Sequence, residues 1–123
     1  MANVAVIIVN YNSGAFLKQC LVSLRQSTIP LEIVVVDNGS SDGSTDFISK
    51  ASRVSDCQLI RNLTNLGFAV AVNQGVQSTT AEDVLLINPD CIVQPHSVAG
   101  LQLAMQREEC GAVGGLVFGF NGR

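Results

Sequence analysis

A short polar stretch after the apolar run "LLI" could bind a cation. It contains Asn88 and Asp90, which are separated only by Pro89. Proline disfavours the helical region for the residue before it, so we expect an extended segment in which Asn88 and Asp90 point to the same side. An amide oxygen beside a carboxylate suits a hard divalent cation, which would take further oxygens from a phosphate and water. The alternative is an ordinary turn with proline at its second position.

A second acid, Asp37, is the first polar residue after Val34–Val36 and opens the stretch "DNGSSDGS". A carboxylate there could accept a hydrogen bond from a ligand N–H, such as the imide of a pyrimidine base. The alternative is turn chemistry, because Asp, Asn, Gly and Ser satisfy local backbone groups and tolerate left-handed geometry. Tyr11, the only tyrosine, could stack on such a base or could be a core ring with a solvated hydroxyl.

A third polar group lies in the stretch "NLTNLGFAVAVNQG", which offers Asn65, Gly67 and Asn73. Residues 65–67 could simply lead the chain into a helix. Asparagine inside a helix is not favoured by propensity, so Asn73 either makes a polar contact or occupies a solvated position. The sequence leaves both alternatives open.

Each polar group must be positioned by a strand, because each follows or borders a short apolar run. Such runs, mostly rich in β-branched residues, are typical of strands that are covered on both faces of a parallel sheet. We expect strands at residues 4–9, 31–36, 57–60, 84–87 and 112–118.

Stretches with helical spacing separate these runs. Apolar residues at steps of three and four predict one helix from 16 to 24 and another from 98 to 105. Their stripes are Phe16, Leu17, Cys20, Leu21 and Leu24, and Val98, Leu101, Ala104 and Met105. Pro95 is well placed near the start of the second helix.

Two weaker helices complete the alternation. Ser41 or Asp42 could cap a short helix that carries residues 47–48, and residues 68–76 form the other candidate, weakened by Gly75. Strands alternating with helices predict an α/β fold: an open, mostly parallel twisted sheet with helices on both faces. If the first strand lies between the second and fourth, the polar groups converge at the carboxyl edge of the sheet, where such folds bind ligands.

The composition limits the class of protein. Of the 123 residues, 47% are hydrophobic and 14% are charged, which favours one packed domain. No apolar run reaches the roughly 18 residues of a membrane span, and no signal sequence is recognisable, so we expect a cytoplasmic protein. The net charge of −3 and the scattered Lys and Arg argue against nucleic-acid binding. Four cysteines without C-x-x-C spacing and a single histidine make zinc improbable.

Four motifs occur in order: "VAVIIVNYNSGAFLKQCLVSL", "LEIVVVDNGSSDGS", "NLGFAVAVNQG" and "LLINPDCIV". Together they resemble the amino-terminal half of family 2 glycosyltransferases, nearest to the rhamnosyltransferase-like branch used in bacterial surface polysaccharide assembly. The resemblance covers essentially the whole chain. It implies a GT-A fold with a Rossmann-like nucleotide-binding half and a dTDP- or UDP-sugar donor, dTDP-rhamnose among them. It also implies a saccharide or lipid-linked acceptor and a divalent cation, Mg²⁺ or Mn²⁺.

The resemblance assigns roles to the first two motifs by position. Val9, Asn10 and Tyr11 would line the base pocket. Asp37 would contact the base, and Asn38 would lie near the nucleoside.

The last two motifs carry the remaining nucleotide-sugar contacts. Asn65, Gly67 and Asn73 match the second nucleotide-binding stretch of the family. Asn88 and Asp90 occupy the place of its D-x-D motif and would hold the metal. The first acid of that motif is replaced by Asn88, which removes one negative charge.

The family performs an inverting displacement in which a carboxylate activates the acceptor hydroxyl. It places that base in the half that follows residue 123. We therefore expect residues 1–123 to be the donor half of a domain truncated at its carboxy terminus, inactive alone. We also expect it to self-associate through its unpaired last strand. A lipid-linked acceptor would place the enzyme at the inner face of the cell membrane.

Two other classes of protein share some of these features. A dinucleotide-dependent dehydrogenase also has an acid after its second strand, but it needs G-x-G-x-x-G after the first, where this chain has "NYNSGAF" with one glycine. A non-catalytic nucleotide-sugar-binding or interaction module remains the alternative.

Overall fold

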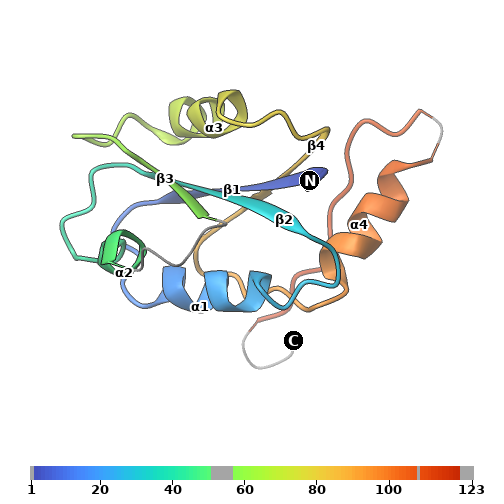
Figure 1. Ribbon diagram of the computed structural model, residues 1–123, viewed down its shortest axis with the longest axis horizontal. Coiled ribbons are helices and arrows are strands. Elements are labelled where there is room, and N and C mark those ends of the chain that lie inside the picture. Colours follow the sequence, from blue (N-terminus) through green and yellow to red (C-terminus); the bar gives the residue numbers. More distant parts are fainter. Residues whose placement is uncertain (1, 51–56, 108, 120–123) are drawn as a thin grey trace.

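A computed structural model describes residues 2–50, 57–107 and 109–119, in which strands and helices alternate (Figure 1). The elements are β1 (Val4–Asn10), α1 (Phe16–Leu24), β2 (Leu31–Asp37), α2 (Asp46–Lys50), β3 (Cys57–Arg61), α3 (Phe68–Gln77), β4 (Asp83–Ile87) and α4 (Ser97–Met105). The first four predicted strands and all four predicted helices are confirmed, with small shifts at their ends.

The strands form one parallel sheet in the order β3-β2-β1-β4. The chain adds β2 and β3 on one side of β1 and then crosses to place β4 on the other side. The first strand therefore lies between the second and the fourth, which was the condition for bringing the polar groups to one edge. The reversal of strand order beside β1 is the position at which open α/β sheets bind ligands.

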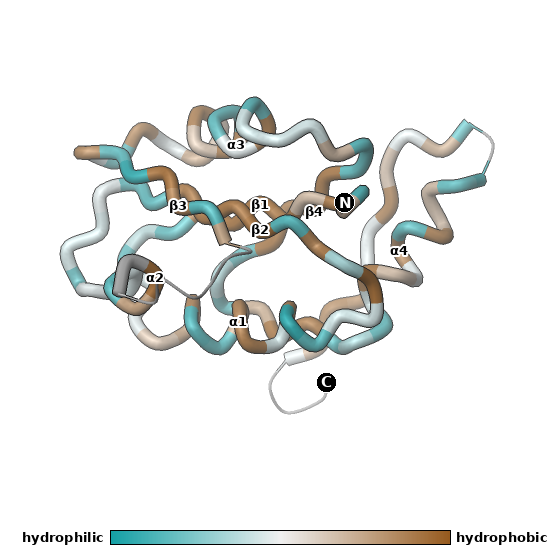
Figure 2. Tube along the Cα trace, in the orientation of Figure 1, coloured by the Kyte–Doolittle hydropathy of each residue, from teal (hydrophilic) through white to brown (hydrophobic). Residues whose placement is uncertain are grey.

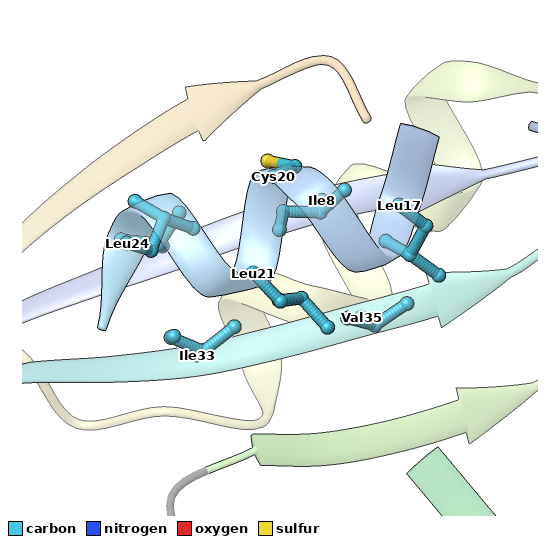
Figure 3. Packing of buried hydrophobic residues seen from close by; sticks show 8 residues of the cluster. Ile8, Leu17, Cys20, Leu21, Leu24, Ile33 and Val35 are labelled. Atoms are coloured by element: carbon cyan, nitrogen blue, oxygen red, sulfur yellow. The ribbon is translucent and has the colours of Figure 1, made fainter. Parts of the chain in front are cut away.

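Helices cover both faces of the sheet (Figure 1). The helix α1 buries Leu17, Cys20, Leu21 and Leu24 against Ile8, Ile33 and Val35, and Figure 3 shows these side chains interdigitating. On the opposite face, Ala71 of α3 packs in a cluster whose sheet members are Ala5, Ile7, Val34 and Val36. In Figure 2 the central strands are mostly hydrophobic, whereas the helices contain both hydrophobic and hydrophilic residues. Because consecutive strand residues face opposite layers, both faces of β1 and β2 must be apolar.

The glycine within α3 has a packing reason. A Cβ at Gly75 would lie 2.5 Å from Cγ2 of Ile7 on β1. The missing side chain lets α3 approach the sheet closely, and Gly75 and Ala71 are the buried residues of this helix. Gly75 therefore costs helix propensity but permits the contact between α3 and the sheet.

The predicted fifth strand is wrong. Residues 111–119 have no regular secondary structure, although they include the apolar run 112–118. A strand needs a neighbour for its backbone hydrogen bonds, and no described residues pair with this segment. Leu116 and Val117 are largely exposed, and Gly114 and Gly115 interrupt the run, so its apolar character alone does not produce a strand here.

The predicted cap of α2 is also wrong. The helix begins at Asp46, beyond both Ser41 and Asp42. The Asp42 carboxylate instead accepts a hydrogen bond from the Ser44 backbone N–H at 2.9 Å, two residues along the chain. Asp42 therefore stabilises the turn that precedes the helix.

Candidate functional site

The strands β1 and β2 end in a buried polar pair. Asn10 and Asp37 stand opposite each other in the parallel register and are 0% and 3% exposed. Each lies two residues beyond a side chain that packs on α1, Ile8 and Val35 respectively, so alternation directs both toward the same face of the sheet. The Asn10 Nδ2 donates a hydrogen bond to Asp37 Oδ1 at 2.9 Å. An amide donor thus faces a carboxylate in the interior.

Serines complete the hydrogen bonding of this pair. The Ser40 hydroxyl donates to Asp37 Oδ1 at 2.6 Å, and the Ser40 backbone N–H donates to Asp37 Oδ2 at 3.1 Å. Asn10 Nδ2 also donates to Ser44 Oγ at 2.9 Å, and Asn10 Oδ1 accepts from the Ser13 hydroxyl. Buried charges need such partners to offset their lost hydration. Sequence reasoning treated Ser40 and Ser44 only as turn residues.

The Asp37 carboxylate keeps some capacity for a ligand. Within the described residues it accepts three hydrogen bonds, from the Asn10 Nδ2, the Ser40 hydroxyl and the Ser40 N–H. A carboxylate offers about four acceptor positions. Oδ1 accepts two of these bonds and Oδ2 one, so the remaining position is on Oδ2. The contact with the Ser40 N–H confirms the turn chemistry considered for this acid, and a ligand role is compatible with it.

The loops after β1 and β2 hold each other. The Asn12 N–H donates to Ser40 Oγ at 2.9 Å, and the Ser41 N–H returns a bond to Asn12 Oδ1 at 2.9 Å. The Gly14 N–H donates to Asp42 Oδ2 at 2.8 Å. Hydrogen bonds from Ser44, helped by the one from Gly14, hold the pKa of the Asp42 carboxyl below its ordinary value. These contacts fix the path of the segment that carries the proposed base-binding residues.

Two of those residues, Val9 and Tyr11, flank Asn10 at the end of β1. Tyr11 is 53% exposed, so it is not a core ring, and one of its two predicted alternatives is wrong. An exposed aromatic ring beside a polar pocket is available for stacking. Val9 is half-buried and packs against the cluster under α3.

A second polar network lies on the other side of the β2 exit. Asn38 is 2% exposed, and its Nδ2 donates to the Gly67 carbonyl at 3.1 Å. Its Oδ1 accepts from Asn62 Nδ2 at 3.0 Å and from the Leu66 N–H at 3.4 Å. Asn62 and Gln74 exchange two hydrogen bonds, at 2.7 and 2.9 Å. Asn62 and Gln74 were not singled out from the sequence, which shows no spacing signal for this pair.

The three residues predicted before and within α3 have different surroundings. Asn65 is exposed, and its Oδ1 accepts from the Gly67 N–H at 2.9 Å. Gly67 precedes the helix with φ of 89°, which favours glycine. Asn73 is exposed, as its solvated alternative predicted, and the polar contact of this turn comes from Gln74. The structure therefore brings Gly67 against Asn38 and leaves the side chain of Asn73 in solvent.

The expected extended segment at Asn88–Asp90 is wrong. The Cys91 N–H donates to the Asn88 carbonyl at 3.2 Å, which closes a turn with Pro89 at its second position. Proline restrains its own φ and the residue before it, and neither restraint keeps Asp90 extended. The turn that was weighed as the alternative is therefore the observed conformation.

The turn still offers suitable ligands for a hard cation. The side chains of Asn88 and Asp90 are exposed at the exit of β4, and carboxylate and amide oxygens suit Mg²⁺ or Mn²⁺. Across the described residues, no group of three or more His, Cys, Asp or Glu forms a metal centre by itself. Two protein oxygens fit a cation that also takes ligand and water oxygens.

A buried thiol lies next to this turn. Cys20 Sγ is 3.9 Å from the Asn88 carbonyl oxygen. Burial, followed by the nearby Cys91 and Asp90, raises the pKa of Cys20 to about 12. Cys20 is buried, as its place in the predicted apolar stripe of residues 16–24 indicates, while the other three cysteines are only half-buried.

Comparison with known proteins gives a consistent family. Residues 5–123 match the family model of Glycosyl transferase family 2. The N-acetylglucosaminyl-diphospho-decaprenol L-rhamnosyltransferase of Mycobacterium tuberculosis is 30% identical over 125 residues, which covers 91% of this chain and 40% of that protein. The putative glycosyltransferase EpsH of Bacillus subtilis is 27% identical over 93 residues, 75% of this chain and 27% of that protein.

Solved structures share the fold. The mannosyltransferase PcManGT of Pyrobaculum calidifontis, in complex with GDP-Man and Mn²⁺, superposes with a TM-score of 0.80 at 25% identity, covering 86% of this chain and 33% of that one. The present chain thus spans a minority of the length of the relatives it matches. Among the described residues, no helix combines the length and apolar character required to cross a membrane.

Proposed function

Since the chain belongs to glycosyl transferase family 2, we propose that residues 1–123 form the donor-binding half of a GT-A glycosyltransferase domain. The observation that carries this proposal is the buried Asn10–Asp37 pair at the carboxyl ends of β1 and β2. A carboxylate fixed at that edge, with an acceptor position left on Oδ2, suits recognition of a ligand N–H where α/β sheets bind nucleotides.

We assign the base to the loop after β1. The exposed ring of Tyr11 stacks on a pyrimidine, Asp37 Oδ2 accepts its imide N–H, and Val9 and Asn10 complete the walls. Asn38 borders the nucleoside from the other side of the β2 exit. An exposed ring and a partly satisfied carboxylate are the two groups that such a base requires.

The remaining predicted residues serve the rest of the nucleotide sugar. Asn65, Gly67 and Asn73 belong to the loop and helix that follow β3, and their exposed positions leave them available to the ligand. Asn88 and Asp90 hold Mg²⁺ or Mn²⁺ together with the diphosphate. When bound there, such a cation would supply positive charge to offset the charge of the departing diphosphate. The Mn²⁺ in the PcManGT complex supports this choice of metal.

We propose a dTDP- or UDP-sugar as the donor, dTDP-rhamnose in particular, and a saccharide or lipid-linked acceptor. The decaprenol-linked acceptor in the name of the mycobacterial relative supports this acceptor class and a place in cell-envelope polysaccharide biosynthesis. It also supports action from the cytoplasm at the inner face of the membrane. The reaction is an inverting displacement whose base lies outside residues 1–123, so the isolated chain binds donor without transferring sugar.

Calorimetry with UDP, dTDP and GDP, each with and without Mn²⁺, tests the proposal. We expect Tyr11→Ala to weaken pyrimidine nucleotide binding roughly 5- to 150-fold, because base–aromatic stacking contributes about 1–3 kcal/mol. Phe118→Ala is the matched control, since this ring is also exposed but lies on residues 111–119. Absence of nucleotide binding by the parent protein would refute the donor site.

The metal assignment has its own variant. Asp90→Ala should abolish the gain in affinity that Mn²⁺ gives and leave metal-free binding unchanged. Glu82→Gln is the control, because it removes an exposed acid just before β4, at the other end of that strand. Equal Mn²⁺ dependence in parent and Asp90→Ala would exclude this metal role. Sugar transfer by the isolated chain would place the base within it.

A further inference from the structure

The amide pair of Asn62 and Gln74 is more than a hydrogen bond between two surface residues. Asn62 follows β3 and Gln74 lies on α3, and both side chains are half-buried. Each amide donates to the other and accepts from it, with Asn62 Nδ2 to Gln74 Oε1 at 2.7 Å and Gln74 Nε2 to Asn62 Oδ1 at 2.9 Å. Reciprocal bonding couples the two amides, since rotating one alone would place like groups together, and the bond from Asn62 Nδ2 to Asn38 Oδ1 selects one of the two coupled orientations.

Asn38 is hydrogen-bonded to this pair, so the orientations of the three amides depend on one another. The second hydrogen of Asn62 Nδ2 points to Asn38 Oδ1, at 3.0 Å. Asn38 must therefore present its own Nδ2 in the other direction, where it donates to the Gly67 carbonyl at 3.1 Å. Asn38 Oδ1 also receives the Leu66 N–H. One defined set of amide orientations runs from Gln74 to the loop in front of α3.

The network also ties this loop to the base-recognition side. The Asn62 N–H donates to the Asp37 carbonyl at 2.8 Å, and the Asn38 N–H donates to the Asn10 carbonyl at 2.9 Å. Displacement of Asn62 would therefore shift both the loop at 63–67 and the end of β2. Low local dielectric makes such connected polar groups mutually reinforcing.

We infer that Asn62 and Gln74 are positioning residues for the nucleotide: they orient Asn38 and hold residues 63–67 in the geometry that the nucleoside requires. This inference rests on the proposed donor site. Neither side chain needs to touch the nucleotide, because the pair acts through Asn38. If the pair were purely structural, replacing Gln74 by a titratable glutamate would change stability, and nucleotide affinity would not depend on whether that glutamate is protonated.

Gln74→Glu tests this inference with almost no change in shape. At neutral pH the introduced carboxylate cannot donate to Asn62 Oδ1, so this oxygen either faces a carboxylate oxygen without a donor or turns over with its amide and repels Asn38 Oδ1. We expect nucleotide affinity to fall roughly 5- to 10-fold, the value of about one hydrogen bond. In the nucleotide-free protein, hydrogen exchange of the Leu66 N–H should accelerate by a similar factor. Gln77→Glu is the matched control, one turn further along α3 and exposed.

Protonation supplies the rescue. Below the pKa of the introduced carboxyl, ordinarily about 4.3, its O–H again donates to Asn62 Oδ1, so the ratio of variant to parent affinity should return toward one as the pH is lowered to about 4. The parent protein is measured at each pH as reference. A melting temperature for each variant separates loss of fold from loss of positioning.

The outcomes are distinct. Weaker binding by Gln74→Glu, faster Leu66 exchange and recovery at low pH support the inference. Equal nucleotide affinity in Gln74→Glu and the parent, or an equal loss in Gln77→Glu, would overturn it while leaving the donor site standing. Failure of the parent to bind any nucleotide would instead overturn the proposed function and the inference with it.

Discussion

Asn10→Asp gives the sharpest test of the buried pair at the ends of β1 and β2. The substitution changes the shape of the side chain very little, but it replaces the Nδ2 donor, 2.9 Å from Asp37 Oδ1, by an oxygen. Two acceptors then face each other in a site where neither residue is exposed by more than 3%. The introduced carboxyl must either ionise beside Asp37 or keep its proton.

The lower of these two costs sets the expected loss. Ionisation places two charges about 2.9 Å apart, which at an effective dielectric constant of about 20 costs roughly 6 kcal/mol. Keeping the proton at pH 7, against an ordinary carboxyl pKa of about 3.9, costs about 4 kcal/mol. Protonation is therefore favoured. A single O–H also leaves Ser44 Oγ without its donor, which adds about 1 kcal/mol.

The sign of the pH dependence follows from this choice. The pKa of the introduced carboxyl is raised in the folded protein, so the variant approaches the parent below the unfolded pKa near 4 and loses stability as the pH rises. We expect a deficit of about 1 kcal/mol at pH 4 and about 4–5 kcal/mol at pH 7, a slope of about 1.4 kcal/mol per pH unit. Urea unfolding of the variant and the parent from pH 4 to 7 measures this difference in the free energy of unfolding. If the variant is already unfolded at neutral pH, the slope of that difference with pH can still be measured below pH 5.5.

Two further variants exclude a trivial cause. Asn65→Asp is the control, because Asn65 is exposed and its Oδ1 only accepts a hydrogen bond, which a carboxylate also does. The exchange variant Asn10→Asp with Asp37→Asn restores one donor and one acceptor, so the steep pH dependence should disappear. Parallel pH profiles for Asn10→Asp and the parent would show that Asn10 Nδ2 does not face Asp37.

Three other expectations follow from single contacts. Gly75→Ala should lower the midpoint of urea unfolding, because overpacking against Ile7 costs about 1–3 kcal/mol and the gain in helix propensity returns only about 1; a raised midpoint would contradict the close approach of α3. Asp42→Ala should be less stable than the parent at pH 7, and this difference should close as the pH falls below about 4. The reason is that the pKa of the Asp42 carboxyl is lowered in the folded protein, so its contribution to stability is lost on protonation. A pH-independent difference in stability would argue against a stabilising role of the Asp42 carboxylate. Cys20, with a pKa of about 12, should resist thiol labelling at pH 8 until the protein unfolds, as mass spectrometry of labelled peptides would show, and fast labelling would mean that α1 opens.

The sequence predicted the parts of the fold that depend on local apolar pattern. Continuous runs such as Val34–Val36 can be buried only between two helical layers, and they formed parallel β-strands. The run at 112–118 is also apolar, but Gly114 and Gly115 interrupt it, and it has no paired neighbour in the described residues; strand pairing is a non-local property that composition does not encode. The prediction of an extended segment at Asn88 failed for a related reason. The preferences of proline allow both an extended segment and a turn, and the hydrogen bond from the Cys91 N–H to the Asn88 carbonyl selects the turn.

The candidate site shows the same division between local and non-local information. Asp37 and Asn10 could be predicted because a polar residue directly after a buried strand is visible in the sequence. Asn62 and Gln74 could not, because their pairing depends on how α3 crosses the end of β3, and an amide in a helix or a loop is unremarkable by itself.

Alternation along β2 explains why both networks meet at its end. Asp37 continues the face of the strand that packs on α1, and the next residue, Asn38, turns to the opposite side and reaches the loop before α3. Two consecutive side chains therefore connect both helical layers to one edge of the sheet. A shift of β2 by one residue would exchange them, placing an amide against Asn10 and a carboxylate against the Gly67 carbonyl, where it has no hydrogen to donate. The polar residues at this edge thus oppose the wrong register as well as shaping the proposed site, so the proposed nucleotide contacts and the strand pairing involve the same two side chains.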